Sequence, residues 1–134
     1  MKLRIRGNSL RLRLTQSEVA NFARQGRIEE SIPLGEMPGH CLGYVLVTDK
    51  SAAALSVSFE HGVISVLVPE VMAASWAGSE EVGLYGEQAW GAGRTVRLSV
   101  EKDFQCLDKR HGEIISDAYP HPAKPGTAKP DVQV

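Results

Sequence analysis

The strongest constraint on the fold is the alternation of apolar and basic residues in the stretch 2-KLRIRGNSLRLRL-14. Successive side chains of a β-strand point to opposite faces of a sheet, and Gly7-Asn8 is a favourable two-residue hairpin turn. Pairing across this turn sets Arg4 opposite Arg11 and places every Leu and Ile on the other face. A single long strand with a bulge at the turn would give the same two faces.

A helix is expected directly after this stretch, at about residues 16–25. Thr15 and Glu18 have the spacing of a capping box, in which each side chain bonds to the backbone N–H of the other residue. Phe22 belongs to a narrow apolar stripe, and Gly26 is a typical C-terminal stop.

The remainder of the chain alternates between strand-like runs and turns. A second, short helix is expected at about 69–77, because Pro69 is well suited to begin one. Strands are expected at 27–34, 41–48, 55–68 (a hairpin turning at His61-Gly62), 81–86 and 94–104. Sequential hairpins of this kind predict an α+β fold with a strongly curved, mainly antiparallel sheet or a partial barrel.

Length and composition are those of one small globular domain. The chain has 134 residues, 43% of them hydrophobic, which is enough for a single core. We expect this domain to span residues 1–122, with a mobile polar tail at 123–134. No export signal or membrane span is recognisable, so we expect a cytoplasmic protein with no membrane partner. The pattern does not indicate an oligomeric state.

The formal net charge of −1 conceals an uneven distribution of charge. The first 14 residues carry five basic side chains and no acid, namely Lys2, Arg4, Arg6, Arg11 and Arg13. Like charges directly opposite each other on paired strands are destabilising, by a fraction of ~1 kcal/mol per pair. These cations therefore need a partner, which is either an acid of this chain or an external anion.

Both kinds of partner are available. The internal candidates are acids on the non-core faces of other predicted strands, namely Glu29, Glu60, Glu101 and Asp103. The external candidate is a ligand with phosphate or carboxylate groups, because the planar guanidinium of arginine matches both. The basic stretch contains no aromatic residue, and aromatics make up 6% of the chain, which argues against nucleic acid as the partner.

Acids around arginines are also what a metal–phosphate site requires. Under this alternative, Glu60, Glu101 and Asp103 would hold a divalent cation, and no other cofactor is expected. A C-terminal group has metal-ligating residue types without a recognised metal-binding spacing; it consists of Cys106, Asp108, His111, Glu113, Asp117 and His121. In the glycine-rich stretch 83–93, Trp90 is either a ligand-stacking ring or a plug at the edge of the core.

Three segments carry a resemblance to a known family: 1-MKLRIRGNSLRLRLTQSEV-19, 100-VEKDFQCLDKR-110 and 116-SDAYPHP-122. Over most of its length the chain resembles a family of small bacterial proteins that form a domain of unknown function. This resemblance implies no activity and no catalytic residue. The family is more acidic just before the third segment than 113-EIIS-116 is here, which counts against Glu113 and Asp117 as metal ligands.

A distant similarity in pattern links the chain to the triphosphate tunnel enzymes. Their closed antiparallel barrel binds triphosphate and metal through inward-pointing Arg, Lys and Glu side chains. They begin with an alternating Glu-x-Glu-x-Lys strand, whereas 2-KLRIR-6 contains no glutamate. The similarity therefore concerns the fold rather than the site.

The leading hypothesis is a small cytosolic protein that binds an anionic small molecule on a basic sheet face. The expected contacts are Arg4, Arg6, Arg11 and Arg13. One alternative is a metal-dependent phosphohydrolase resembling the triphosphate tunnel enzymes. Another is a noncatalytic protein-interaction module in which the arginines pair internally. The residues do not decide whether the protein is an enzyme.

Overall fold

Two four-stranded mixed sheets and two helices make up the computed structural model, which describes residues 1–104, 117, 119 and 120. Sheet A has the order β1-β2-β8-β7, with β1 Lys2–Arg6, β2 Ser9–Leu14, β8 Arg94–Lys102 and β7 Gly83–Gly91. Sheet B has the order β3-β4-β6-β5, with β3 Arg27–Pro33, β4 Cys41–Asp49, β6 Val63–Pro69 and β5 Ser56–Glu60. The helices are α1 Gln16–Gln25 and α2 Glu70–Ala77.

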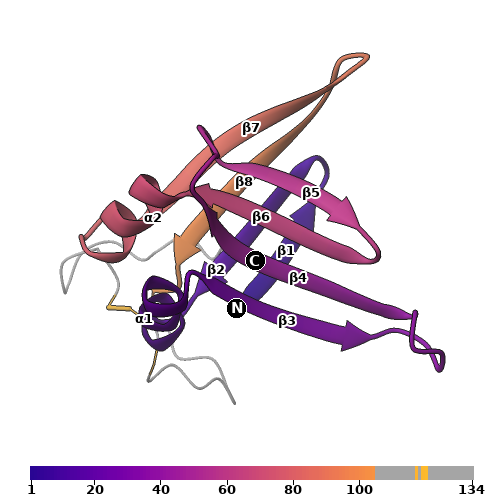
Figure 1. Ribbon diagram of the computed structural model, residues 1–134, viewed down its shortest axis with the longest axis horizontal. Coiled ribbons are helices and arrows are strands. Elements are labelled where there is room, and N and C mark those ends of the chain that lie inside the picture. Colours follow the sequence, from indigo (N-terminus) through magenta and orange to yellow (C-terminus); the bar gives the residue numbers. More distant parts are fainter. Residues whose placement is uncertain (105–116, 118, 121–134) are drawn as a thin grey trace, which may run out of the picture.

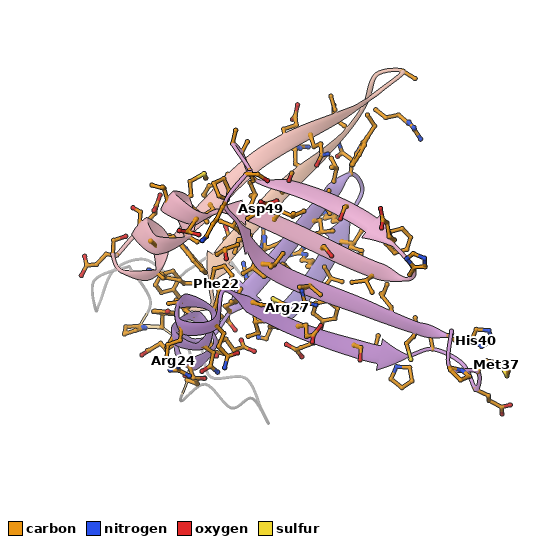
Figure 2. All side chains as sticks on the ribbon, in the orientation of Figure 1. Phe22, Arg24, Arg27, Met37, His40 and Asp49 are labelled. Atoms are coloured by element: carbon orange, nitrogen blue, oxygen red, sulfur yellow. The ribbon has the colours of Figure 1, made fainter. Side chains whose placement is uncertain are left out.

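The inner faces of the two sheets share one hydrophobic core. Leu12 and Val100 from sheet A and Leu46 and Val66 from sheet B are fully or almost fully buried in it. Both helices lie at one end of the molecule, and the strand turns of both sheets point away from them (Figure 1). The loop between β3 and β4, which carries Met37 and His40, is correspondingly far from α1 (Figure 2). The sheets are not closed into a barrel.

Phe22 of α1 and Trp76 of α2 belong to this core and join the two helices. Their ring centroids are 6.3 Å apart in an edge-on arrangement, which is favourable for aromatic pairs. Trp76 is fully buried, and its indole N–H donates to the carbonyl of Val82 at 3.2 Å. The aromatic pair therefore fixes the helices to each other and to the start of β7.

The predicted local structure is confirmed at both ends of α1. Thr15 Oγ1 accepts from the N–H of Glu18 at 3.4 Å, and Glu18 Oε1 accepts from the N–H of Thr15 at 2.9 Å. Gly26 adopts a left-handed conformation, with φ of 71°, and its N–H donates to the carbonyl of Phe22 at 2.7 Å. The helix therefore begins and ends where the capping signals place it.

The predicted α+β class is confirmed, and so is the register of the first hairpin, with Arg4 opposite Arg11. The prediction of a short helix after Pro69 is also confirmed. Within the mainly antiparallel arrangement, the central strand pairs β2–β8 and β4–β6 are parallel. The expected strand at 81–86 was too short, because β7 continues to Gly91 and forms a long hairpin with β8.

The two halves of the chain repeat one arrangement of elements. The order β1-β2-α1-β3-β4 is followed by β5-β6-α2-β7-β8, and exchanging the halves converts the strand order of sheet A into that of sheet B. Leu12 pairs with Val100 between the parallel strands β2 and β8, and Val66 pairs with Leu46 between the parallel strands β6 and β4. Val66 lies 54 positions after Leu12, and Val100 lies 54 positions after Leu46, so the two pairs correspond. Each half thus supplies a counterpart for most positions of the other.

Candidate functional site

The basic face is defined here as the outer surface of sheet A, which points away from the core. Because Leu10, Leu12 and Leu14 of β2 point inward, the alternate residues of each strand point outward. The basic face comprises Lys2, Arg4, Arg6, Ser9, Arg11, Arg13, Arg97, Ser99, Glu101, Tyr85 and Glu87. All four arginines that the sequence indicates as ligand contacts therefore share one surface.

At the end of the basic face nearer the helices, the cations are paired. Glu101 Oε1 lies 3.4 Å from Arg11 Nε and 3.6 Å from Arg13 Nε. Tyr85 also donates its hydroxyl to Glu101 at 2.9 Å. Burial, together with this hydrogen bond to a carboxylate, raises the pKa of Tyr85 above its ordinary value. One carboxylate thus serves two guanidinium groups and a phenol.

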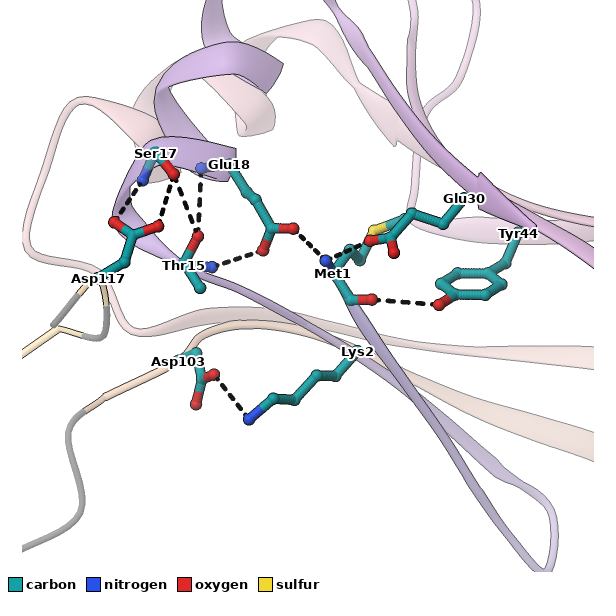
Figure 3. A network of polar contacts seen from close by, with 9 residues as sticks. All are labelled: Met1, Lys2, Thr15, Ser17, Glu18, Glu30, Tyr44, Asp103 and Asp117. Atoms are coloured by element: carbon teal, nitrogen blue, oxygen red, sulfur yellow. Dashed lines mark hydrogen bonds and ion pairs between the residues drawn. The ribbon is translucent and has the colours of Figure 1, made fainter. Parts of the chain in front are cut away.

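Lys2 at the edge of the same surface pairs with Asp103. The distance between Lys2 Nζ and Asp103 Oδ2 is 3.1 Å (Figure 3). The structure therefore places two of the four acids proposed as partners, Glu101 and Asp103, beside the N-terminal cations. Because the Lys2 side chain is 70% exposed, this ion pair contributes little to stability.

At the end nearer the Gly7-Asn8 turn, the arginines are not neutralised. Arg4, Arg6 and Arg97 form no ion pair with any residue that the structure describes. Arg6 and Arg97 flank Ser9 in one row across three strands, and both are exposed. Glu87, opposite Arg97 on β7, is the acid at this end of the face, and no ion pair joins them.

Arg97 is a basic residue of this surface that the sequence did not assign to the site. Its position on the outward side of a strand was readable from the alternation in 94–104. The sequence did not predict that Arg97 lies beside Ser9 of β2, because β2 and β8 are parallel and far apart in the chain. A search for further basic residues on the non-core faces of other strands would have found it.

The acids of the metal-dependent alternative are not brought together. Glu60 lies on β5 of sheet B, whereas Glu101 and Asp103 lie with sheet A. No group of three or more potential metal ligands occurs within the described residues. The proposed C-terminal ligands lie outside the described residues except for Asp117, which accepts from Ser17 N–H at 3.1 Å and from its hydroxyl at 2.5 Å near the start of α1.

A polar network beside the helix N-terminus is a second concentration of charge. The amino group of Met1 contacts the carboxylates of Glu18 and Glu30, and Tyr44 donates its hydroxyl to the Met1 carbonyl at 3.3 Å (Figure 3). Burial opposes the charged form of Glu18, but hydrogen bonds from Met1 and Thr15 outweigh it and lower the pKa of this carboxyl. These groups satisfy one another, so the network is structural.

A comparison with known protein families finds a match over most of the chain. The model of a family of unknown function (DUF7009) matches residues 1–123. The chain belongs to that family. The match includes every strand and helix described above, so the basic face is part of the DUF7009 unit. The resemblance inferred from the N-terminal motif is thereby confirmed.

Two other comparisons give no further relative. No curated protein and no solved structure matches this DUF7009 chain.

Within the described part of the chain, neither helix has the length and apolar character needed to cross a membrane.

Proposed function

We propose that the basic face binds a small ligand carrying phosphate or carboxylate groups. Arg4, Arg6 and Arg97 have no ion-pair partner among the described residues, and this observation carries the proposal. Guanidinium groups bind both classes of anion through paired hydrogen bonds. Arg11 lies directly opposite Arg4 and shares the Glu101 carboxylate with Arg13. Arg11 can therefore donate hydrogen bonds to an anion that is bound by Arg4.

The second half of the chain supports this proposal, because the fold does not need cations on that surface. The counterparts of Arg4 and Arg11 in sheet B are Ser58 and Ser65, which lie opposite each other on β5 and β6. Opposed arginines are therefore a local cost in sheet A that its counterpart avoids. Such local departures from favourable pairing are expected at functional sites.

Internal pairing accounts for only part of the charge. It covers Lys2, Arg11 and Arg13, whereas the cations near the Gly7-Asn8 turn are left over. The separation of Glu60 from Glu101 gives no support to a metal-dependent phosphohydrolase. Binding of an anion is therefore the function that the geometry of the basic face supports best.

Calorimetric titration at low salt tests this proposal directly. The probes are inorganic phosphate, pyrophosphate, tripolyphosphate and citrate, added to the wild type and to the Arg4→Ala/Arg11→Ala double variant. We expect the double variant to bind at least about tenfold more weakly, because a hydrogen bond to a charged group contributes ~1.5–3 kcal/mol.

The matched control is Arg24→Ala/Arg27→Ala, which removes the same charge from the end of α1 and the start of β3 (Figure 2). We expect this control to bind the probes within about twofold of the wild type, because the Coulomb attraction of a charge acting through water is weak compared with the direct hydrogen bonds of a guanidinium group. Absence of binding by every probe at millimolar concentration would overturn the proposal. Equal weakening in both double variants would also contradict it, since only the overall charge would then matter.

A further inference from the structure

A hollow of about 680 Å³ opens where the basic face ends, between the β1–β2 turn and the β7–β8 hairpin. Its lining residues are Asn8, Trp90, Gly93, Arg94 and Thr95. It therefore combines an aromatic ring, a guanidinium group, a carboxamide and a hydroxyl. This set is suited to a flat, polar, aromatic group rather than to an apolar chain.

Trp90 is placed in this hollow by a β-bulge. The pairing of β7 with β8 shifts between Ala89 and Gly91, which leaves Trp90 as the extra residue of β7. A bulge bends its strand and redirects a side chain that regular alternation would send elsewhere. Trp90 is 48% exposed, in contrast to the fully buried Trp76, so part of its ring surface is accessible to a ligand.

Polar groups beside the ring can recognise the edge of a flat ligand. The side-chain nitrogen of Asn8 donates to the carbonyl and the hydroxyl of Thr95, each at 3.3 Å. These contacts orient the carboxamide and leave its oxygen to accept a hydrogen bond. Arg94 offers donors only and forms no ion pair with the described residues. A donor and an acceptor thus flank the aromatic surface, as a nucleobase requires.

The hollow and the arginines follow one another along β8. Thr95, Arg97 and Ser99 are alternate residues on the same side of this strand, so each step is about 7 Å. Arg97 shares its row with Arg6, and Ser99 shares the next row with Arg11. A ribose would lie over the first step, and a chain of two or three phosphates, within reach of the long arginine side chains, would lie over the second.

We propose that the ligand of the basic face is a nucleoside di- or triphosphate, with its base stacked on Trp90 and its phosphates on the arginines. This inference rests on the proposed function, because it identifies the ligand of the same surface. Of the exposed rings on this surface, Tyr85 is held by its hydrogen bond to Glu101, which leaves Trp90 to stack one base, so a mononucleotide fits better than a nucleic acid strand.

Fluorescence and calorimetric titrations with ATP, GTP, tripolyphosphate and adenosine test the inference. We expect ATP or GTP to bind about 5- to 150-fold more tightly than tripolyphosphate, which is the contribution of one stacked base. Nucleotide should quench the emission of Trp90, since Trp76 is buried. Trp90→Ala should abolish the preference without changing the affinity for tripolyphosphate, and Trp90→Phe should keep part of it.

The matched control is Phe59→Ala, which removes an exposed aromatic ring, 65% accessible, from sheet B and should change neither affinity. Tripolyphosphate that binds as tightly as ATP in the wild type would overturn the inference and leave the proposed function standing. Failure of all phosphates to bind would overturn both. An octanucleotide that binds more than tenfold tighter than ATP would overturn the assignment to a mononucleotide.

Discussion

The two halves of the chain build the same architecture with different chemistry at counterpart positions. Beside α1, three charged groups meet, whereas beside α2 the corresponding contact is apolar. Leu55 and Met72, each 54 positions further along the chain, are the counterparts of Met1 and Glu18. Gly86 is the counterpart of Glu30, because it pairs with Leu98 as Glu30 pairs with Tyr44, 54 positions earlier. A Cβ at Gly86 would lie only 3.1 Å from Leu55 Cβ, so glycine permits close packing there. The same arrangement of elements is thus held by a partly buried ion network in one half and by close apolar contact in the other.

The outer faces of the two sheets differ just as clearly. Sheet A presents Arg4 and Arg11 where sheet B presents Ser58 and Ser65. Because the serine version forms an equivalent hairpin, the arginines are not required for strand pairing. The comparison separates groups that maintain the fold from groups that are available for a ligand.

The largest expected effect concerns the aromatic pair that both halves contribute. Trp76→Ala should lower the free energy of unfolding by about 3–5 kcal/mol, because it leaves a cavity beneath α2 and removes the contact with Phe22. Urea denaturation followed by circular dichroism measures this loss. Trp90→Ala is the control with an exposed ring and should cost less than about 1 kcal/mol. A loss below about 1 kcal/mol for Trp76→Ala would show that the pair does not join the halves.

The ion network of the first half gives the next effect. Glu18→Gln should lower the free energy of unfolding by about 1–3 kcal/mol, because it weakens the capping box and leaves the Met1 amine with one carboxylate. The control Glu29→Gln breaks only an exposed pair with Arg27 and should cost at most about 0.5 kcal/mol. Equal losses in the two variants would contradict a special role for the network.

The same network should make stability depend on pH. The pKa of Glu18 lies below its ordinary value of 4.5 in the folded chain, so its contribution is present above that pH and is lost as the pH falls. Burial disfavours the charged Met1 amine, but Glu18 and Glu30 outweigh it and raise its pKa above 8.0; that contribution is lost as the pH rises through the raised value. Unfolding measured from pH 3 to 10 should show both declines, and Glu18→Gln should flatten the acid one. An unchanged acid decline in this variant would assign it to other carboxyls.

The smallest effect on stability is expected on the basic face. Arg4→Ser/Arg11→Ser copies the residues of sheet B into sheet A and should leave the free energy of unfolding unchanged or raise it by about 0.2–1 kcal/mol. Urea denaturation at low salt measures the difference. A loss of more than about 1 kcal/mol would show that these arginines are structural, and the comparison between the two outer faces would then lose its functional meaning.

Local signals in the sequence predicted most of the strands and helices but not how the strands assemble into two sheets. The hairpin register follows from alternation around Gly7-Asn8, and α1 follows from its capping residues, because both depend on neighbours in the chain. The parallel pairing of β2 with β8 joins strands that no turn connects, so Arg97 could not be placed beside Arg6. The repeat is not visible in the amino-acid sequence, because counterparts such as Leu12 and Val66 share only apolar character.

The most direct test of the central claim observes the arginine side chains themselves. Two-dimensional ¹H–¹⁵N spectra of the arginine Nε groups can be recorded while pyrophosphate is added at low salt. Anion binding on the basic face predicts saturable shifts for Arg4, Arg6, Arg11 and Arg97, and none for Arg24 and Arg27. No saturable shift in the first group, or equal shifts in both groups, would contradict it.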